Sequence, residues 1–265
     1  MSSRQRWTRD ELLIALNLYH KLTFGQMHGR QPSIIALAER LNRRSSDSLA
    51  MKLCNFASLD PALKMRGIKG LSGASALDRS IWQEFHAHLS ELAPASEEAF
   101  RKLFATSDSW IVEVTPTEGV RITRPPPVGP TEVSATTKVR RGQEYFRQAV
   151  LNNFGGRCGV TGLAIRELLI ASHILPWGEH EAERLNVRNG LCLSRLHDAA
   201  FDNGLVGFDG NFRLVLSKQL KAALPQRAVA ESFVAYEGEA LQLSNDAVLP
   251  DERFLAKHFL SVFKK

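Results

Sequence analysis

Two short apolar strands, followed at once by a short helix, constrain the fold of the C-terminal half more than any other feature. The first strand, 168–174, ends near His173, and the second, 191–193, follows a tight turn at Asn189. About two turns of helix open near His197 and stop at an Asn-Gly pair that suits a C-terminal cap. The order is therefore a strand with a histidine, a turn with an asparagine, a second strand and a helix beginning with a histidine.

Four sequence blocks in this region resemble the HNH endonuclease family, whose nuclease fold is the ββα-metal finger. They are similar above all to a restriction-like subgroup of that family, over about residues 138–263, roughly half of the chain. The blocks are Cys158-Gly-Val-Thr161-Gly162, Ser172-His173-Ile174-Leu-Pro176-Trp177, Asn189-Gly190-Leu191-Cys-Leu193 and His197-Asp198-Ala-Ala-Phe201-Asp202-Asn-Gly204. A single His-Ile-x-Pro stretch would be a weak signal, but four ordered blocks are a strong one.

The resemblance implies a role for each motif residue. His173 is the general base that activates a water for attack on the scissile phosphate, and His197 is a ligand of one divalent cation. Asn189 fixes the loop and thereby the His173 ring. Cleavage of a phosphodiester needs a deprotonated nucleophile, charge stabilisation at the non-bridging oxygens and help for the leaving 3′ oxygen. A histidine that titrates near neutrality supplies the first, and one metal supplies the other two. We expect Mg²⁺, with Mn²⁺ or another transition metal as the alternative.

The chain departs from the wider superfamily at Ser172, where many relatives have an Asp or His that binds the metal. The second protein ligand is therefore left unassigned. Asp198 and Asp202 lie about 100° and 140° from His197 around the helix axis, so neither shares its face. We expect these carboxylates to cap or brace the finger, with waters and phosphate oxygens completing the metal shell.

The remaining histidines and the cysteines have no companions that point to chemistry. Cys54, Cys158 and Cys192 form no CxxC pair and are interpreted as small buried hydrophobic residues. We interpret six histidines as non-catalytic: His20, His28, His86, His88, His180 and His258.

The N-terminal half has a helical pattern from Trp7 to about Pro94. Its first helix opens with a Thr8-x-x-Glu11 capping box. A second helix begins at Pro32, and a polar turn, 42–46, separates it from a third, which is the outline of a helix-turn-helix. The alternative is a solvated basic turn between two ordinary helices.

Basic residues near this turn and in the C-terminal half are candidate DNA contacts. They are Arg40, Arg43, Arg44, Lys52, Arg140, Arg141 and Arg188.

The predicted fold class is α+β, with a mostly helical N-terminal domain and an HNH ββα-metal finger that has extra helices and a β-hairpin. The domain prediction is a helical DNA-recognition domain over 1–123, a Pro-rich linker over 124–137 and a nuclease domain over 138–265. Two hairpins are expected, one at 110–122 and one at 205–216, where Asp-Gly-Asn forms the turn.

Composition and charge narrow the class of partner. The formal charge of +6 and the pI near 9.4 favour a polyanion, because Lys and Arg that neutralise phosphates release condensed counterions. No run of about 18 apolar residues and no apolar signal stretch is present, so we expect a cytoplasmic protein.

The function that these observations favour is a metal-dependent, restriction-like DNA endonuclease acting on double-stranded DNA, with modified DNA as a target to consider. One finger per chain cuts one strand, so double-strand cutting predicts a homodimer. Two alternatives stay open: a catalytically inactive DNA-binding regulator with an HNH fold, and an RNA-cleaving toxin.

Overall fold

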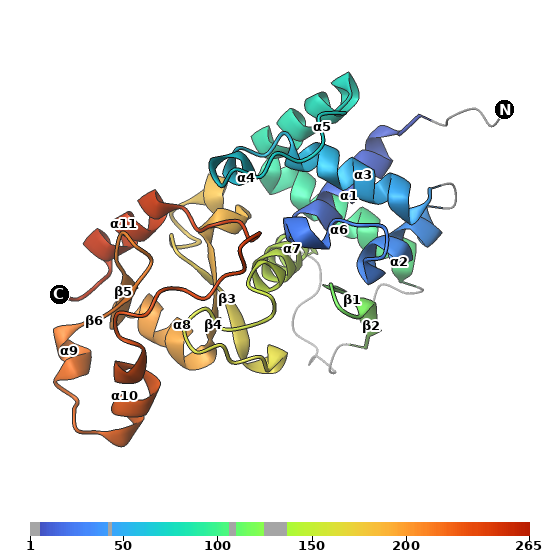
Figure 1. Ribbon diagram of the computed structural model, residues 1–265. Helices are drawn as coiled ribbons and strands as arrows, with labels where there is room; N and C mark the ends of the chain where they lie inside the picture. Colours follow the sequence, from blue (N-terminus) through green and yellow to red (C-terminus); the bar gives the residue numbers. More distant parts are fainter. Residues whose placement is uncertain (1–5, 42–43, 106–109, 125–136) are drawn as a thin grey trace. The chain divides into compact units, whose positions relative to one another are not determined.

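The computed structural model describes residues 6–41, 44–105, 110–124 and 137–265, and its class is α+β, as predicted. Helices dominate the N-terminal part, and the strands form short antiparallel pairs (Figure 1). Residue contacts divide the chain into two compact units, unit 1 over residues 1–152 and unit 2 over residues 153–265. None of the described helices has the length and apolar composition needed to cross a bilayer.

Unit 1 is built around one central helix that is buried along most of its length. Thr8 and Glu11 form the predicted capping box: the Thr8 hydroxyl accepts from the Glu11 N–H, and the Glu11 carboxylate accepts from the Thr8 N–H at 2.9 Å. Residues from Leu12 to Tyr19 are buried, and the helix packs against α3, α5 and α6. The helices of this bundle are α1 (Arg9–Tyr19), α2 (Pro32–Arg40), α3 (Ser46–Ala57), α4 (Pro61–Met65), α5 (Ala76–Ala87) and α6 (Leu89–Phe104), with a 3₁₀ turn η1 (Phe24–Gln26).

A hairpin and a long helix complete unit 1. Strands β1 (Ile111–Thr115) and β2 (Gly119–Thr123) pair antiparallel, which confirms the first predicted hairpin. Helix α7 (Thr137–Asn153) is hydrogen-bonded to β1 through its Gln148 side chain. The Gln148 amide accepts from the Val114 N–H at 3.1 Å and donates to the Val112 carbonyl at 2.9 Å.

These contacts place α7 with unit 1, whereas the sequence interpretation assigned 138–152 to the nuclease domain. The reason is physical, because buried backbone groups along a strand require hydrogen-bond partners. Gln148 and Asn152 supply them, the latter by donating to the Val114 carbonyl at 2.9 Å. The Pro-rich stretch 125–136 lies outside the described residues.

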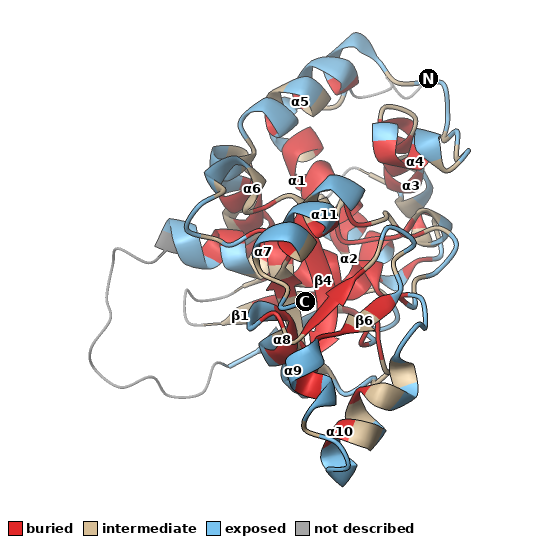
Figure 2. Ribbon diagram, turned by 90° about the vertical axis from the view of Figure 1, so that its left-hand side faces the viewer, coloured by how far each residue is buried: buried red, intermediate tan, exposed pale blue. Residues whose placement is uncertain are grey.

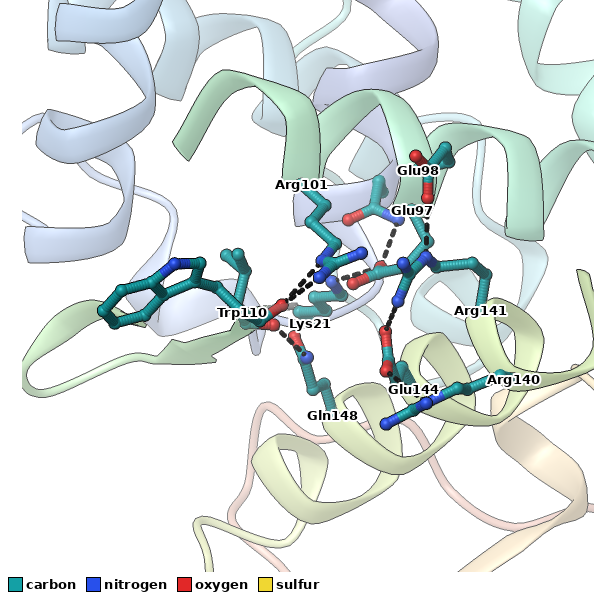
Figure 3. A network of polar contacts seen from close by, with 11 residues as sticks. Lys21, Glu97, Glu98, Arg101, Trp110, Arg140, Arg141, Glu144 and Gln148 are labelled. Atoms are coloured by element: carbon teal, nitrogen blue, oxygen red, sulfur yellow. Dashed lines mark hydrogen bonds and ion pairs between the residues drawn. The ribbon is translucent and has the colours of Figure 1, made fainter. Parts of the chain in front are cut away.

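Ion pairs tie α7 to α6 as well (Figure 3). Arg141 donates to Glu98 at 2.6 Å and to Glu144 at 2.8 Å. Beside them, the fully buried Lys21 ammonium of unit 1 pairs with Glu97 at 2.5 Å. Removing one partner of such a buried pair leaves an uncompensated charge, so these contacts fix the helix positions.

Unit 2 contains the predicted ββα order. Strands β3 (Leu169–His173) and β4 (Gly190–Ser194) pair antiparallel, with His173 opposite Gly190, and α8 (Arg195–Asp202) follows β4 directly. Strand β4 is buried throughout (Figure 2). The second predicted hairpin is confirmed by β5 (Val206–Phe208) and β6 (Leu214–Leu216).

The remaining helices of unit 2 surround this finger. They are α9 (Lys218–Lys221), α10 (Arg227–Ser232) and α11 (Glu252–Ser261), with 3₁₀ turns η2 (Arg166–Leu168), η3 (Glu181–Glu183), η4 (Val187–Asn189) and η5 (Val234–Tyr236). Cys158 and Cys192 are buried, as predicted, and Cys54 of unit 1 is half-buried.

Candidate active site

A cavity of about 440 Å³ opens in unit 2 where the end of β3 meets α8 and α11. The polar side chains that line it come from all three elements, and Trp177 forms part of its wall. These polar residues are Ser172, His173, Asp198, Asp202 and His258. A concave site that gathers several titratable groups is the natural place for chemistry in this unit.

His173 is oriented by the loop that follows β3. Its Nε2–H donates to the Arg184 carbonyl at 2.9 Å, so the lone pair of the neutral ring is on Nδ1. The ring meets Trp177 edge to face, with centroids 5.2 Å apart. Burial lowers the pKa of His173, opposed by the Arg184 carbonyl and the negative charge of Asp198. The ring is therefore neutral, and able to accept a proton, at neutral pH.

Asn189 stabilises the same loop through hydrogen bonds of its side chain. It is fully buried, its Oδ1 accepts from the Leu175 N–H at 2.8 Å, and its Nδ2 donates to the Glu183 carbonyl at 3.1 Å. Glu183 precedes Arg184, whose carbonyl fixes His173. These are the contacts that a loop-bracing asparagine requires.

Two carboxylates of α8 face the cavity together. Asp198 and Asp202 are four residues apart, which places them about 40° apart around the helix axis. Burial and, to a smaller extent, the nearby negative charge of Asp198 together raise the pKa of Asp202 to about 6. A cation bound at these carboxylates would favour the ionised form of Asp202.

Ser172 adds a third oxygen to this cavity. Its hydroxyl is buried and has no hydrogen-bond partner among the described residues. Buried polar atoms without partners are rare in folded proteins, so this one is suited to a ligand. Hydroxyl and carboxylate oxygens are the donors that Mg²⁺ and Mn²⁺ accept. Within the described part of the chain, no three His, Cys, Asp or Glu side chains are placed to hold a metal ion.

The structure does not bring His197 to the cavity. Its Nε2–H donates to the Ser232 carbonyl at 2.9 Å, and its Nδ1 accepts from the Ser194 hydroxyl at 2.8 Å. The buried ring packs on Phe233, with centroids 5.0 Å apart. His197 therefore joins the start of α8 to α10, while the two carboxylates expected to brace the finger line the cavity. Neither carboxylate shares the helix face of His197, but Asp198 and Asp202 share a face with each other, and that face lines the cavity.

His258 was interpreted as non-catalytic, yet it lines the cavity. It comes from α11, its ring stacks on Phe201 with centroids 3.7 Å apart, and its Nε2–H donates to the Phe201 carbonyl at 3.2 Å. Burial lowers the pKa of His258 to about 4. Its position depends on how α11 packs, and the only signal in the sequence was its place within the last helix.

Most of the predicted DNA contacts are engaged within the protein. The Arg44 side chain is 6% exposed, donates to Glu11 at 2.8 Å and lies over the Trp7 ring. Lys52 is buried and donates to both carboxylate oxygens of Asp78 at 2.8 Å. These two cations therefore hold unit 1 together.

The other predicted contacts divide in the same way. Arg141 is paired with Glu98 and Glu144, and Arg188 is paired with Asp251 at 3.2 Å. Arg40 and Arg140 are the exposed members of the set, and Arg43 lies outside the described residues.

A family model described as HNH endonuclease matches residues 158–209. The match includes His173, Asn189, His197 and both carboxylates of α8, but not His258. A search of the curated proteins found no match.

Proposed function

We propose, from the membership of residues 158–209 in the HNH endonuclease family, that the chain is a metal-dependent endonuclease that hydrolyses phosphodiester bonds in double-stranded DNA. The observation that supports this most directly is the cavity where His173, Asp198 and Asp202 converge beside a buried, unpartnered Ser172 hydroxyl. Acid–base chemistry and a metal-binding oxygen cluster then share one site.

His173 is the general base in this proposal. With its Nε2–H held by the Arg184 carbonyl, Nδ1 is the atom that takes a proton from the attacking water. Asn189 and Trp177 keep the loop and the ring in place.

The divalent ion is assigned to Asp198 and Asp202, with Ser172 as a third protein donor. A bound cation supplies charge stabilisation for the phosphate oxygens and for the leaving 3′ oxygen. The donors are all oxygens, so Mg²⁺ is the expected ion and Mn²⁺ the alternative.

Unit 1 is proposed to bind and select the DNA, as in a restriction-like enzyme. The charge distribution supports this role. Residues 1–152 contain 21 Lys and Arg against 15 Asp and Glu, whereas residues 153–265 contain 13 of each. All of the formal +6 therefore belongs to unit 1, which favours a polyanionic partner for that unit. Modified cytosines or phosphorothioate links are the target features to test first.

The test is cleavage of one plasmid in unmodified, cytosine-modified and phosphorothioate forms, with Mg²⁺, Mn²⁺ or EDTA. Metal-dependent cutting that falls about 10²- to 10⁴-fold in His173→Ala is the expected result, because a positioned general base contributes that much. His180→Ala is the matched control and retains cutting. Intact DNA binding without cutting in any metal would favour the inactive regulator, and preferential cutting of RNA would favour the toxin.

A further inference from the structure

We propose that unit 1 contacts the DNA backbone through the α4–α5 segment, residues 61–80. This inference rests on the proposed function, and it replaces the turn between α2 and α3 as the main DNA-contacting surface. The segment comprises α4, the connection that follows it and the start of α5 (Figure 1).

The surface charge of the segment is of one sign. Its basic residues are Lys64, Arg66, Lys69 and Arg79, and its single acid is Asp78. Asp78 is fully buried, and both of its carboxylate oxygens accept from Lys52. The segment therefore presents cations with no acidic side chain of its own at the surface.

Three of these cations are also available to a partner. Lys64, Lys69 and Arg79 are exposed, and in the described part of the chain none of them forms an ion pair. Arg79 donates one hydrogen bond to the Ala74 carbonyl at 3.1 Å, which leaves further guanidinium donors. Arg44 and Lys52, by contrast, form ion pairs with carboxylates of unit 1.

The connection after α4 is fixed on the end of α3. The Leu71 N–H donates to the Cys54 carbonyl at 3.0 Å. Gly70 has φ +59°, and a Cβ atom there would lie 2.5 Å from the Ser58 nitrogen and 2.6 Å from the Cys54 oxygen. Only glycine allows this approach. A surface held in this way loses little conformational entropy on binding, which favours its use for recognition.

Apolar side chains accompany the cations along the same segment. Met65 is 70% exposed, Leu71 47% and Leu77 41%. Proteins that bind duplex DNA combine Lys and Arg on the phosphates with apolar side chains placed against sugars or between base steps. The mixture of exposed cations and exposed aliphatic groups therefore fits duplex DNA.

The experiment uses the full-length His173→Ala protein, so that binding is measured without cutting. Affinity for a fluorescent 30-base-pair duplex is measured by anisotropy at several salt concentrations, for this parent and for K64A/K69A/R79A in the same background. The matched control is R30A/K102A/R121A, which removes the same charge from exposed positions of unit 1. Circular dichroism and thermal unfolding verify that both variants are folded.

We expect the α4–α5 variant to bind at least about tenfold more weakly than the control, with the slope of log K against log salt reduced by about 2 to 3. Equal affinities and equal salt slopes in the two triple variants would overturn the proposal that the α4–α5 segment contacts DNA. The nuclease proposal would still stand after that result, provided that the protein with His173 intact cuts plasmid. A parent that binds no DNA and a wild type that cuts none overturn both.

Discussion

At the scale of single residues, the finger separates a histidine that braces the fold from two carboxylates suited to a metal. Both ring nitrogens of His197 are hydrogen-bonded to Ser194 and Ser232, away from the cavity. Asp198 and Asp202 point into the cavity with His173. Substitution of His197 should therefore lower the stability of the fold, whereas substitution of a carboxylate should lower the affinity for a metal ion.

We expect His197→Ala to lower the free energy of unfolding by about 1–3 kcal/mol, because buried partners lose their hydrogen bonds. Its Mn²⁺ affinity should stay near that of wild type. Asp202→Asn should be no less stable than wild type but should bind Mn²⁺ at least about tenfold more weakly, because ligand charge sets affinity for hard cations. Calorimetric titration with Mn²⁺ and thermal unfolding measure both quantities. A His197→Ala protein that keeps its stability and loses Mn²⁺ would return the ligand role to this histidine.

The raised pKa of Asp202 gives the stability a defined dependence on pH. This pKa is about 6 in the folded chain against an ordinary value of 3.8, so the folded state binds more protons between these values. Its contribution to stability is present below about pH 4 and lost as the pH rises through 6. Asn mimics the protonated acid, so in metal-free protein Asp202→Asn should be more stable than wild type at pH 8, by about 1 kcal/mol after allowance for solvent screening.

Thermal unfolding of both proteins in EDTA from pH 4 to 8 measures this difference. The gain should vanish near pH 4, where wild-type Asp202 is also protonated in the folded state. Protons compete with the metal ion for the Asp202 carboxylate. The Mn²⁺ affinity of wild type should therefore decrease as the pH is lowered through about 6. A stability difference that is constant across the range would contradict the assignment.

At the scale of elements, the parts of the fold that depend on local pattern were predicted and the parts that depend on distant partners were not. Strands β3 and β4, helix α8, both hairpins and the Thr8 capping box follow from nearby residues. His258 could not be predicted, because it reaches the cavity through the packing of α11 against β5 within unit 2.

Helix α7 shows the same limit. No local pattern in the sequence shows that Gln148 and Asn152 will bind the backbone of β1. The common face of the α8 carboxylates could have been predicted, because residues at i and i+4 are neighbours on a helix surface. In the sequence, each carboxylate was compared with His197, and the two were not compared with each other.

Gln148→Ala tests the docking of α7 on β1. The substitution leaves the Val114 N–H and the Val112 carbonyl without the amide partner, and unsatisfied buried backbone groups cost about 1–3 kcal/mol each. We expect a loss of about 2 kcal/mol in denaturant unfolding followed by circular dichroism. Gln143→Ala, an exposed position of the same helix, should change stability by less than about 0.5 kcal/mol. Equal effects of the two substitutions would show that the amide contacts contribute nothing.

At the scale of the whole molecule, the basic charge and the candidate chemistry belong to different units. Unit 1 contains the entire excess of cations, and unit 2, which is neutral overall, contains the cavity with His173. On the proposed function, unit 1 supplies affinity for DNA and unit 2 carries out the cleavage. Loss of charge in unit 1 should then weaken DNA binding, whereas substitutions in the cavity should affect the chemical step.

One finger in each chain has a consequence for the product of cutting. On the proposed function, one site in each chain cleaves one strand, so we expect a double-strand break to require two chains on the DNA. We expect nicked plasmid to accumulate first at low protein concentration, and the rate of linearisation to rise with about the second power of protein concentration. Mixing wild type with excess His173→Ala protein should suppress linear product more than nicked product, because mixed pairs cut one strand. Light scattering that shows a monomer both free and on DNA, together with efficient linearisation at a rate proportional to protein concentration, would contradict the paired arrangement.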